Sequence, residues 1–429
     1  MKRSWMMMLA VLAAMSVGLC AQGLPFGALP VPSPASAPQA SGPAPVASAP
    51  QVSAPAAQRE WLVLVFMNGV NNLGIWGCLT NNLNQMEAVG STDKVAVLAE
   101  YGLLSAGDSQ SLQFQQGAKT VYIRRDADPS NVTSPVIYTS NFSDMGSADN
   151  LVLFAKRALR LYPAKKLAVI VWNHGAGRLG ISFDDVSKNY MRVDDLGRAL
   201  GQIAQAAGHK VDLFATDACL MQMAEVAYEL RNSVKVIVGS EETVPGDGYP
   251  YTPILASLTA DPGMGPEQLG GVIVDDYLAN YNTDATLSAL RTAALPTFVR
   301  ALDNWLEALK ADPKAFAAAA DPELGNSVSH FGYKDSKDLV DYVDRVDASP
   351  DAGPQVKAAG AALKNFIENA LLIRYGARPA GDDPYTASNG LAIYMPDLRY
   401  DSANYETLSF SGDSEWGDFL LALMQKRLN

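Results

Sequence analysis

The chain has few of the residues that most often carry chemistry. It contains three cysteines and three histidines in 429 residues, namely Cys20, Cys78, Cys219, His174, His209 and His330. No Cys-x-x-Cys pair and no close pair of histidines occurs, which excludes zinc fingers and the helix-borne motif of zinc proteases. The cysteines are also too few and too far apart in sequence for a disulfide framework. Any reaction that needs a thiol or an imidazole therefore has very few candidates.

Charge is also scarce and unbalanced. Charged residues make up 18% of the chain, and 45 Asp plus Glu against 33 Lys plus Arg give a net charge of −12. An acidic chain of this kind argues against nucleic acid or an anionic membrane surface as the main partner. Hydrophobic residues make up 48%, so the chain as a whole can build a core. No later apolar run reaches the ~20 residues of a membrane span, so we expect no transmembrane helix.

The N-terminus is typical of an export signal. A basic start precedes an apolar run, and cleavage after Ala21 would give a signal peptide over residues 1–21. The segment Val17-Gly18-Leu19-Cys20 also resembles a lipoprotein box, although a leucine stands where a small residue is expected. We therefore predict a secreted or periplasmic protein, with a lipid anchor at Cys20 as the less favoured alternative. Residues 22–58 are rich in Pro, Ala and Ser and predict an unfolded linker.

The hydrophobic pattern changes at residue 59, where predicted buried strands begin to alternate with predicted amphipathic helices. Continuous apolar runs predict strands at Trp61–Met67, Val95–Ala99, Leu167–Trp172, Val211–Ala215 and Val234–Val238. Helical periodicity covers Leu79–Val89, Ala148–Leu161, Val193–Ala207 and Leu220–Leu230. This alternation predicts an α/β sandwich with a mostly parallel sheet over residues 59–255. Residues 256–429 are mainly helical, with one late strand at Gly390–Met395.

Reactive side chains follow two of these strands. His174 stands two residues after Trp172, and Cys219 follows the strand that begins at Val211. Carboxyl ends of parallel strands meet at one edge of a sheet, where ligands bind in such folds. A helix that begins at Leu220 would place the Cys219 thiol at a helix N-terminus and favour the thiolate. A Cys–His pair there can transfer acyl groups, with the backbone N–H groups of Gly175 and Cys219 as oxyanion donors.

The two residues also have ordinary structural interpretations. A lone cysteine after a buried strand is usually a small core residue, and a histidine before glycine is usually a turn or cap residue. The motifs around them settle the choice. The segments Trp172-Asn-His-Gly-Ala-Gly177, Asp217-Ala-Cys-Leu-Met221 and Pro245-Gly-Asp-Gly-Tyr-Pro-Tyr251 resemble the clostripain family of cysteine endopeptidases, which belongs to the caspase, legumain and gingipain group. Further matches are Trp61–Met67, Asn71-Asn72-Leu73, Gly239–Glu242 and Gly390–Tyr394.

The resemblance implies a caspase-haemoglobinase-like α/β sandwich and a role for each matched residue. Cys219 would be the nucleophile and His174 the general acid/base, in a dyad without a third orienting residue. The family cleaves after basic residues, and Asp217 and Asp247 match its acidic residues in the substrate-binding pocket. A carboxylate there can bind Arg as a forked pair or Lys as a point charge. The structural alternatives are a helix cap for Asp217 and a turn residue for Asp247.

The resemblance also bears on processing and on metal binding. Members are commonly cut in the loop between the histidine and cysteine strands, which here runs from Gly175 to about Met191 and holds Arg178 and Lys188. Lys188 lies farther from His174 in a polar stretch, so we predict self-cleavage after Lys188. Relatives leave a Ca²⁺ requirement open, and Phe183-Asp184-Asp185 could supply oxygens. No other metal or cofactor is implied. Val70 departs from the family, which usually has Asp before Asn-Asn-Leu.

Two other functions fit parts of the sequence. Gly175-Ala-Gly-Arg-Leu-Gly180 matches the dinucleotide-binding fingerprint of an oxidoreductase, but that fingerprint requires a helix to open at its third glycine. The residues after Gly180 have no helical spacing. An exported binding protein that kept the fold and lost catalysis is the other alternative, although both His174 and Cys219 are present. We therefore expect an exported cysteine endopeptidase that acts on peptides and proteins after Arg or Lys.

Overall fold

The computed structural model describes residues 58–105, 113–114, 117–140, 144–379, 385–397 and 399–428. The predicted signal peptide over residues 1–21, Cys20 and the predicted linker up to residue 57 lie outside the described residues. Within them, no helix combines the length and the apolar composition of a bilayer span.

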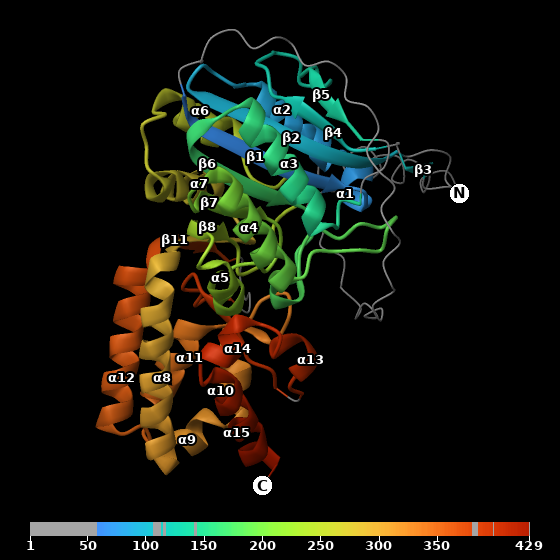
Figure 1. Cartoon of the computed structure of the whole chain (residues 1–429). Helices are drawn as coiled ribbons and strands as arrows, with labels where there is room; N and C mark the ends of the chain where they lie inside the picture. Colours follow the sequence, from blue (N-terminus) through green and yellow to red (C-terminus); the bar gives the residue numbers. More distant parts are fainter. Residues whose placement is uncertain are drawn as a thin grey trace, which may run out of the picture.

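A large sheet forms the upper half of the molecule in Figure 1. Five adjacent strands run parallel, in the order β2 (Val95–Ser105), β1 (Arg59–Gly69), β6 (Ala164–Trp172), β7 (Val211–Asp217) and β8 (Val234–Gly239). Antiparallel strands extend one side as β4 (Lys119–Tyr122) and β5 (Val136–Thr139), and the other as β9 (Ala285–Arg291) and β11 (Leu372–Arg378). The short β3 (Gln113–Phe114) pairs with β2. All five predicted sheet strands are confirmed as the parallel centre.

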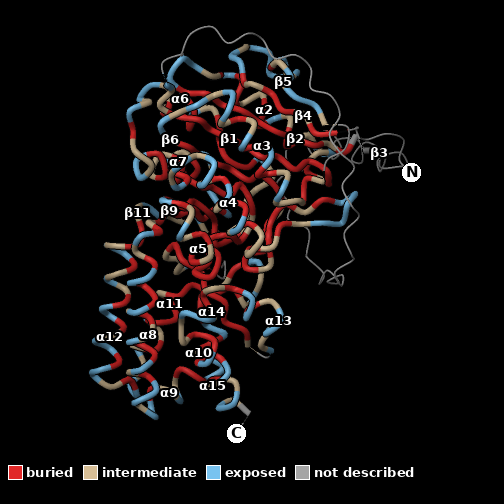
Figure 2. Tube along the Cα trace, in the orientation of Figure 1, coloured by how far each residue is buried: buried red, intermediate tan, exposed pale blue. Residues whose placement is uncertain are grey.

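Helices cover both faces of this sheet. Side chains of β1 alternate between two apolar clusters, with Leu62, Leu64 and Phe66 on one face and Val63 and Val65 on the other. The first face packs against α3 (Ala148–Leu161), α4 (Val193–Ala207) and α5 (Ala224–Leu230), and the second against α2 (Cys78–Glu87), α6 (Tyr251–Ala260) and α7 (Pro266–Asn280). The central strands β1 and β6 are therefore buried on both sides over most of their length, as Figure 2 shows in red. This confirms the predicted α/β sandwich.

The C-terminal part is mainly helical and lies below the sheet (Figure 1). Its helices are α8 (Leu295–Ala311), α9 (Pro313–Ala319), α10 (Pro322–Ser327), α11 (Leu339–Ala348), α12 (Pro354–Phe366), α13 (Ser402–Tyr405), α14 (Ser409–Asp413) and α15 (Trp416–Leu428). The apolar cluster on one face of the sheet extends into these helices and includes Trp305 of α8, Tyr342 of α11 and Trp416 of α15. The core is therefore continuous between the two parts, and the sheet takes β9 and β11 from beyond residue 255.

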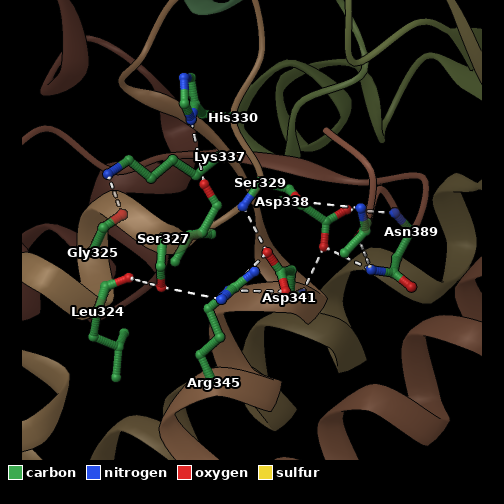
Figure 3. A network of polar contacts seen from close by, with 12 residues as sticks. Leu324, Gly325, Ser327, Ser329, His330, Lys337, Asp338, Asp341, Arg345 and Asn389 are labelled. Carbon is green, nitrogen blue, oxygen red and sulfur yellow. Dashed lines mark hydrogen bonds and ion pairs between the residues drawn. The ribbon is translucent and has the colours of Figure 1, made fainter. Parts of the chain in front are cut away.

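The predicted strand near the C-terminus is present, but it does not join the large sheet. β12 (Ala392–Tyr394) pairs with β10 (Ser336–Asp338) in a two-stranded antiparallel sheet. A polar network secures it (Figure 3), in which the Asp338 carboxylate accepts hydrogen bonds from the N–H groups of Asp341 and Asn389 at 2.7 and 2.6 Å. Glu241, just beyond β8, accepts one from the Gly390 N–H at 2.9 Å. The loop after β8 is thereby tied to the C-terminal part.

One predicted boundary is wrong. The helix expected from Leu220 begins only at Ala224, as α5, and Leu220 has a left-handed φ of 65°. The cause is tertiary, because the N–H groups of Leu220 and Gln222 donate to the carbonyls of Glu242 and Ser240 in the loop after β8. These bonds keep the chain outside a helix up to Met223, with Leu220 in a turn.

Candidate active site

His174 and Cys219 lie at the carboxyl edge of two adjacent parallel strands. Trp172 of β6 is in register with Asp217 of β7, and each reactive residue follows two positions later. The two loops approach closely, since a Cβ on Gly175 would come within 2.3 Å of the Cys219 carbonyl oxygen. Glycine is therefore required by space at position 175.

The half-buried Cys219 thiol accepts hydrogen bonds from backbone N–H groups. The Val244 N–H donates to its Sγ at 3.3 Å, and the Gly175 N–H also donates toward it. Burial nevertheless dominates and raises the pKa of the thiol to about 11, with further increases from Glu242 and Asp217. Because α5 begins five residues after Cys219, the expected activation by a helix N-terminus is wrong. In this state the thiol is protonated at neutral pH.

The His174 ring is half-buried and has a side-chain partner. Its Nε2 lies 2.7 Å from the Oδ1 of Asn72, in the short helix α1 (Asn72–Ile75) after β1. Burial lowers the pKa of His174, and the negative charge of Asp185 raises it in part. A neutral imidazole can accept the thiol proton at neutral pH. The sequence indicated only that polar residues follow the first strand; the pairing of β1 with β6 brings Asn72 to the same sheet edge as His174.

Asp217 is buried directly beneath the loop that follows β8. It is 4% exposed, and its Oδ2 accepts hydrogen bonds from the Tyr249 N–H and the Tyr251 hydroxyl, both at 3.0 Å. Burial raises the pKa of this carboxyl to about 7, against the effect of those two hydrogen bonds. A Cβ on Gly248 would come within 2.7 Å of the same oxygen. The structural alternative for Asp217 fails, because it does not cap α5.

Asp247 lies in the loop after β8, and its environment differs from that of Asp217. Its side chain is exposed, at the corner of a turn in which the Gly248 N–H donates to the Pro245 carbonyl at 2.8 Å. The Asp247 carbonyl accepts a hydrogen bond from the Asn82 side chain at 2.8 Å, which ties the turn to α2. Asp217, the last residue of β7, is therefore the buried acid, and Asp247, in the loop after β8, is the exposed acid.

The two basic residues of the loop between Gly175 and Met191 differ in accessibility. Arg178 is 8% exposed, its guanidinium pairs with Asp401 at 3.1 Å, and it stacks 3.8 Å from the ring centroid of Tyr394. Lys188 is exposed in a turn, with a left-handed φ of 60°. Lys188 is therefore the accessible basic residue of this loop, and Arg178 is buried.

The glycine motif does not build a dinucleotide site. Gly177–Leu179 form one 3₁₀ turn, and Gly175 then bridges Ile181 in antiparallel fashion. The next helix, α4, begins only at Val193. The helix N-terminus that would hold a pyrophosphate is therefore missing after Gly180.

The carboxylate of Asp184, in the acidic loop considered for Ca²⁺, is already engaged in hydrogen bonds. Asp184 Oδ1 accepts from the N–H groups of Val186 and Ser187, and its Oδ2 accepts from the Met145 N–H. The carboxylate is thus used to shape the loop. Nor do the residues described by the structure contain any group of three or more His, Cys, Asp or Glu side chains that could hold a metal ion.

Comparisons with known proteins give one consistent answer. The model of the clostripain family matches residues 65–422. Clostripain from Hathewaya histolytica is 25% identical over 331 residues, which span 64% of this chain and 62% of that protein. The chain thus matches less than two thirds of the length of this curated relative.

Solved structures agree on the fold. A secreted C11 cysteine protease from Bacteroides thetaiotaomicron in complex with an irreversible peptide inhibitor has a TM-score of 0.63 and 20% identity, over 84% of this chain and 99% of that one. An inactive zymogen C11 protease from Parabacteroides distasonis has a TM-score of 0.61 and 21% identity, over the same shares. At this identity the likeness shows the fold, which is caspase-like. Because the family model spans most of the chain and the motif-based prediction agrees with it, this protein belongs to the clostripain family of cysteine endopeptidases.

Proposed function

We propose that this protein is an exported cysteine endopeptidase that cleaves peptide bonds after Arg or Lys with Cys219 and His174 as a dyad. The observation that carries the proposal is the register of β6 and β7, which brings the His174 and Cys219 loops together above the buried Asp217. Family membership supports the reaction class. Its substrates are peptides and proteins with a basic residue before the cleaved bond.

The reaction begins with a neutral pair. Burial raises the pKa of Cys219 and lowers that of His174, so both groups start uncharged. His174 removes the thiol proton as Sγ attacks the substrate carbonyl carbon, and the carbonyl oxygen becomes an oxyanion. The N–H groups of Gly175 and Cys219 stabilise this oxyanion. Collapse breaks the C–N bond, and the protonated His174 gives its proton to the leaving amine.

Hydrolysis of the acyl-enzyme returns the pair to its starting state. His174 takes a proton from water as the oxygen attacks the thioester carbon. Collapse of the second oxyanion breaks the C–S bond, releases the carboxylic acid and returns the proton to Cys219. The same ring thus serves as base and acid in both halves of the reaction.

Specificity for a basic residue depends on Asp217, with Asp247 as a second acid at the surface. The buried Asp217 has a pKa of about 7, so a guanidinium or ammonium group placed beside it would favour its ionised form. Discrimination arises because a basic side chain stabilises the ionised carboxylate, whereas a neutral side chain gives that charged form no partner. The exposed Asp247 attracts the basic side chain before it is desolvated.

Self-cleavage after Lys188 is part of this proposal. The accessibility of Lys188 and the burial of Arg178 support that choice of site. β6 and β7 lie on opposite sides of the cut and pair over Ala168–Trp172, so the two chains would stay associated. Export through the leader over residues 1–21 completes the proposal.

Labelling by an arginyl chloromethylketone tests the dyad and the specificity together. We expect the parent protein to gain one label at Cys219, and the Cys219→Ala and His174→Ala variants to gain none. A set of peptides that differ only before the cleaved bond should be cut after Arg and Lys. A folded parent protein that neither takes the label nor cuts these peptides would instead favour a binding protein on the same fold.

A further inference from the structure

The His174 ring makes one described side-chain hydrogen bond, and its partner is Asn72. The distance from Nε2 to Asn72 Oδ1 is 2.7 Å. Asn72 follows β1, which pairs in parallel with β6 through Met67 and Trp172, so both side chains come from the same edge of the sheet. The His174 backbone is held separately, because its carbonyl accepts the Ser182 N–H at 3.1 Å. The ring orientation therefore depends on Asn72.

The position of Asn72 is itself tightly set. Asn71 caps α1, and its side-chain amide donates to the Phe183 carbonyl at 3.0 Å. Gly74 packs so closely on the end of β1 that a Cβ would come within 2.0 Å of the Gly69 carbonyl oxygen. Such a short, pinned helix holds a side chain at a defined place, as a positioning group must be held.

The surroundings also show which charges act on the ring. Val70 is fully buried at the position where the family usually has an acid, so no carboxylate from that position faces the site. The Val70 carbonyl accepts the Asp185 N–H at 2.8 Å, and Asp185 is the charged group whose field reaches His174. The direct partner of the ring is thus a neutral amide.

We propose that Asn72 is a positioning residue that holds the His174 ring with its hydrogen on Nε2, so that Nδ1 is the nitrogen that accepts the Cys219 proton. An amide oxygen only accepts, so Nε2 must donate to it. A neutral imidazole has a single N–H, which leaves the lone pair on Nδ1. When Nδ1 takes the proton, the charged ring donates more strongly to Asn72. The contact therefore strengthens along the reaction and acts on kcat. This inference rests on the proposed role of His174.

Three variants test the assignment: Asn72→Ala, Asn72→Asp and the matched control Asn81→Ala, which changes an exposed residue of α2. We expect Asn72→Ala to lower kcat about ten- to a hundredfold with little change in KM, the range for a lost hydrogen bond to a charged group. Asn72→Asp keeps the acceptor and adds a negative charge. It should retain much of kcat and move the acidic limb of the kcat profile to higher pH, because the charge raises the pKa of His174 while the bound basic side chain keeps Asp217 ionised. Asn81→Ala should match the parent.

The outcomes separate this inference from the proposed function. If His174→Ala still hydrolyses peptides, the dyad is wrong and the role of Asn72 fails with it. If His174→Ala is inactive while Asn72→Ala keeps the parental kcat and pH profile, only the Asn72 assignment is overturned. Should Asn72→Ala fail to fold, Asn72→Asp decides alone, and an acidic limb at the parental pH would refute the inference.

Discussion

Replacing Asp217 by asparagine should stabilise the protein at alkaline pH while it damages function. Moving the pKa of this carboxyl from its ordinary 3.8 to about 7 means that keeping it ionised in the fold costs about 4 kcal/mol. Asparagine can accept the same two hydrogen bonds from Tyr249 and Tyr251 through its oxygen and carries no charge. Since some of this cost is relieved by local relaxation, we expect the variant to gain about 2 to 4 kcal/mol above pH 8.

The sign follows from proton binding. Between pH 4 and 7 the folded protein holds a proton on Asp217 that the unfolded chain has lost, so the stability contributed by this group falls as pH rises and levels off above pH 7. The variant should lack this fall. The two proteins should therefore differ least near pH 4 and most above pH 7.

Urea unfolding at a series of pH values measures the effect. Both proteins should carry Cys219→Ala, so that self-cleavage does not interfere. Asp247→Asn is the matched control, because it makes the same change at an exposed carboxyl. Parallel curves of unfolding free energy for Asp217→Asn and its parent from pH 5 to 9 would refute the reasoning.

Further predictions concern activity. Asp217→Asn should reduce kcat/KM for an Arg peptide roughly ten- to a hundredfold, and an unchanged preference for Arg would show that Asp217 is not in the substrate pocket. The parental kcat/KM for that peptide should rise with pH through about 7. Cys219→Ala and His174→Ala should each abolish hydrolysis, and the double variant should be no worse, which kinetics on the three proteins would show. Iodoacetamide should label intact Cys219 faster as the pH rises above 9, because burial raises the pKa of its thiol to about 11, whereas a plateau already at pH 7 would contradict that environment. Lys188→Gln should remain a single chain on incubation, which sequencing of new N-termini checks; a nick at the same place in Cys219→Ala would point to another protease.

The central strands were predictable because burial on both faces leaves a continuous apolar run. The runs at Trp61–Met67 and Leu167–Trp172 became β1 and β6, and the helices at Ala148–Leu161 and Val193–Ala207 have the predicted bounds. The strands β9 and β11 were missed. β9 contains Thr, Ser and Ala among its apolar residues, and β11 lies at the sheet edge with several exposed positions, so neither has a clear local pattern.

The surroundings of Cys219 could not be predicted from local sequence. The spacing after Leu220 is helical, yet hydrogen bonds from Leu220 and Gln222 to the loop after β8 delay the helix to Ala224. The thiol consequently lies among the N–H groups of Val244 and Gly175, and burial controls its pKa. These contacts join segments that are distant in the chain.

The sequence alone was enough to indicate the fold class, the strand ends that carry His174 and Cys219, and the family, because apolar periodicity and short motifs are local properties. The partner of His174, the burial of Asp217 and the different exposure of Arg178 and Lys188 were decided only by the tertiary structure. Hydrogen-bond distance and desolvation depend on how residues far apart in sequence pack together. Asn72 and His174 are separated by 102 positions and meet only because β1 and β6 are neighbours in the sheet.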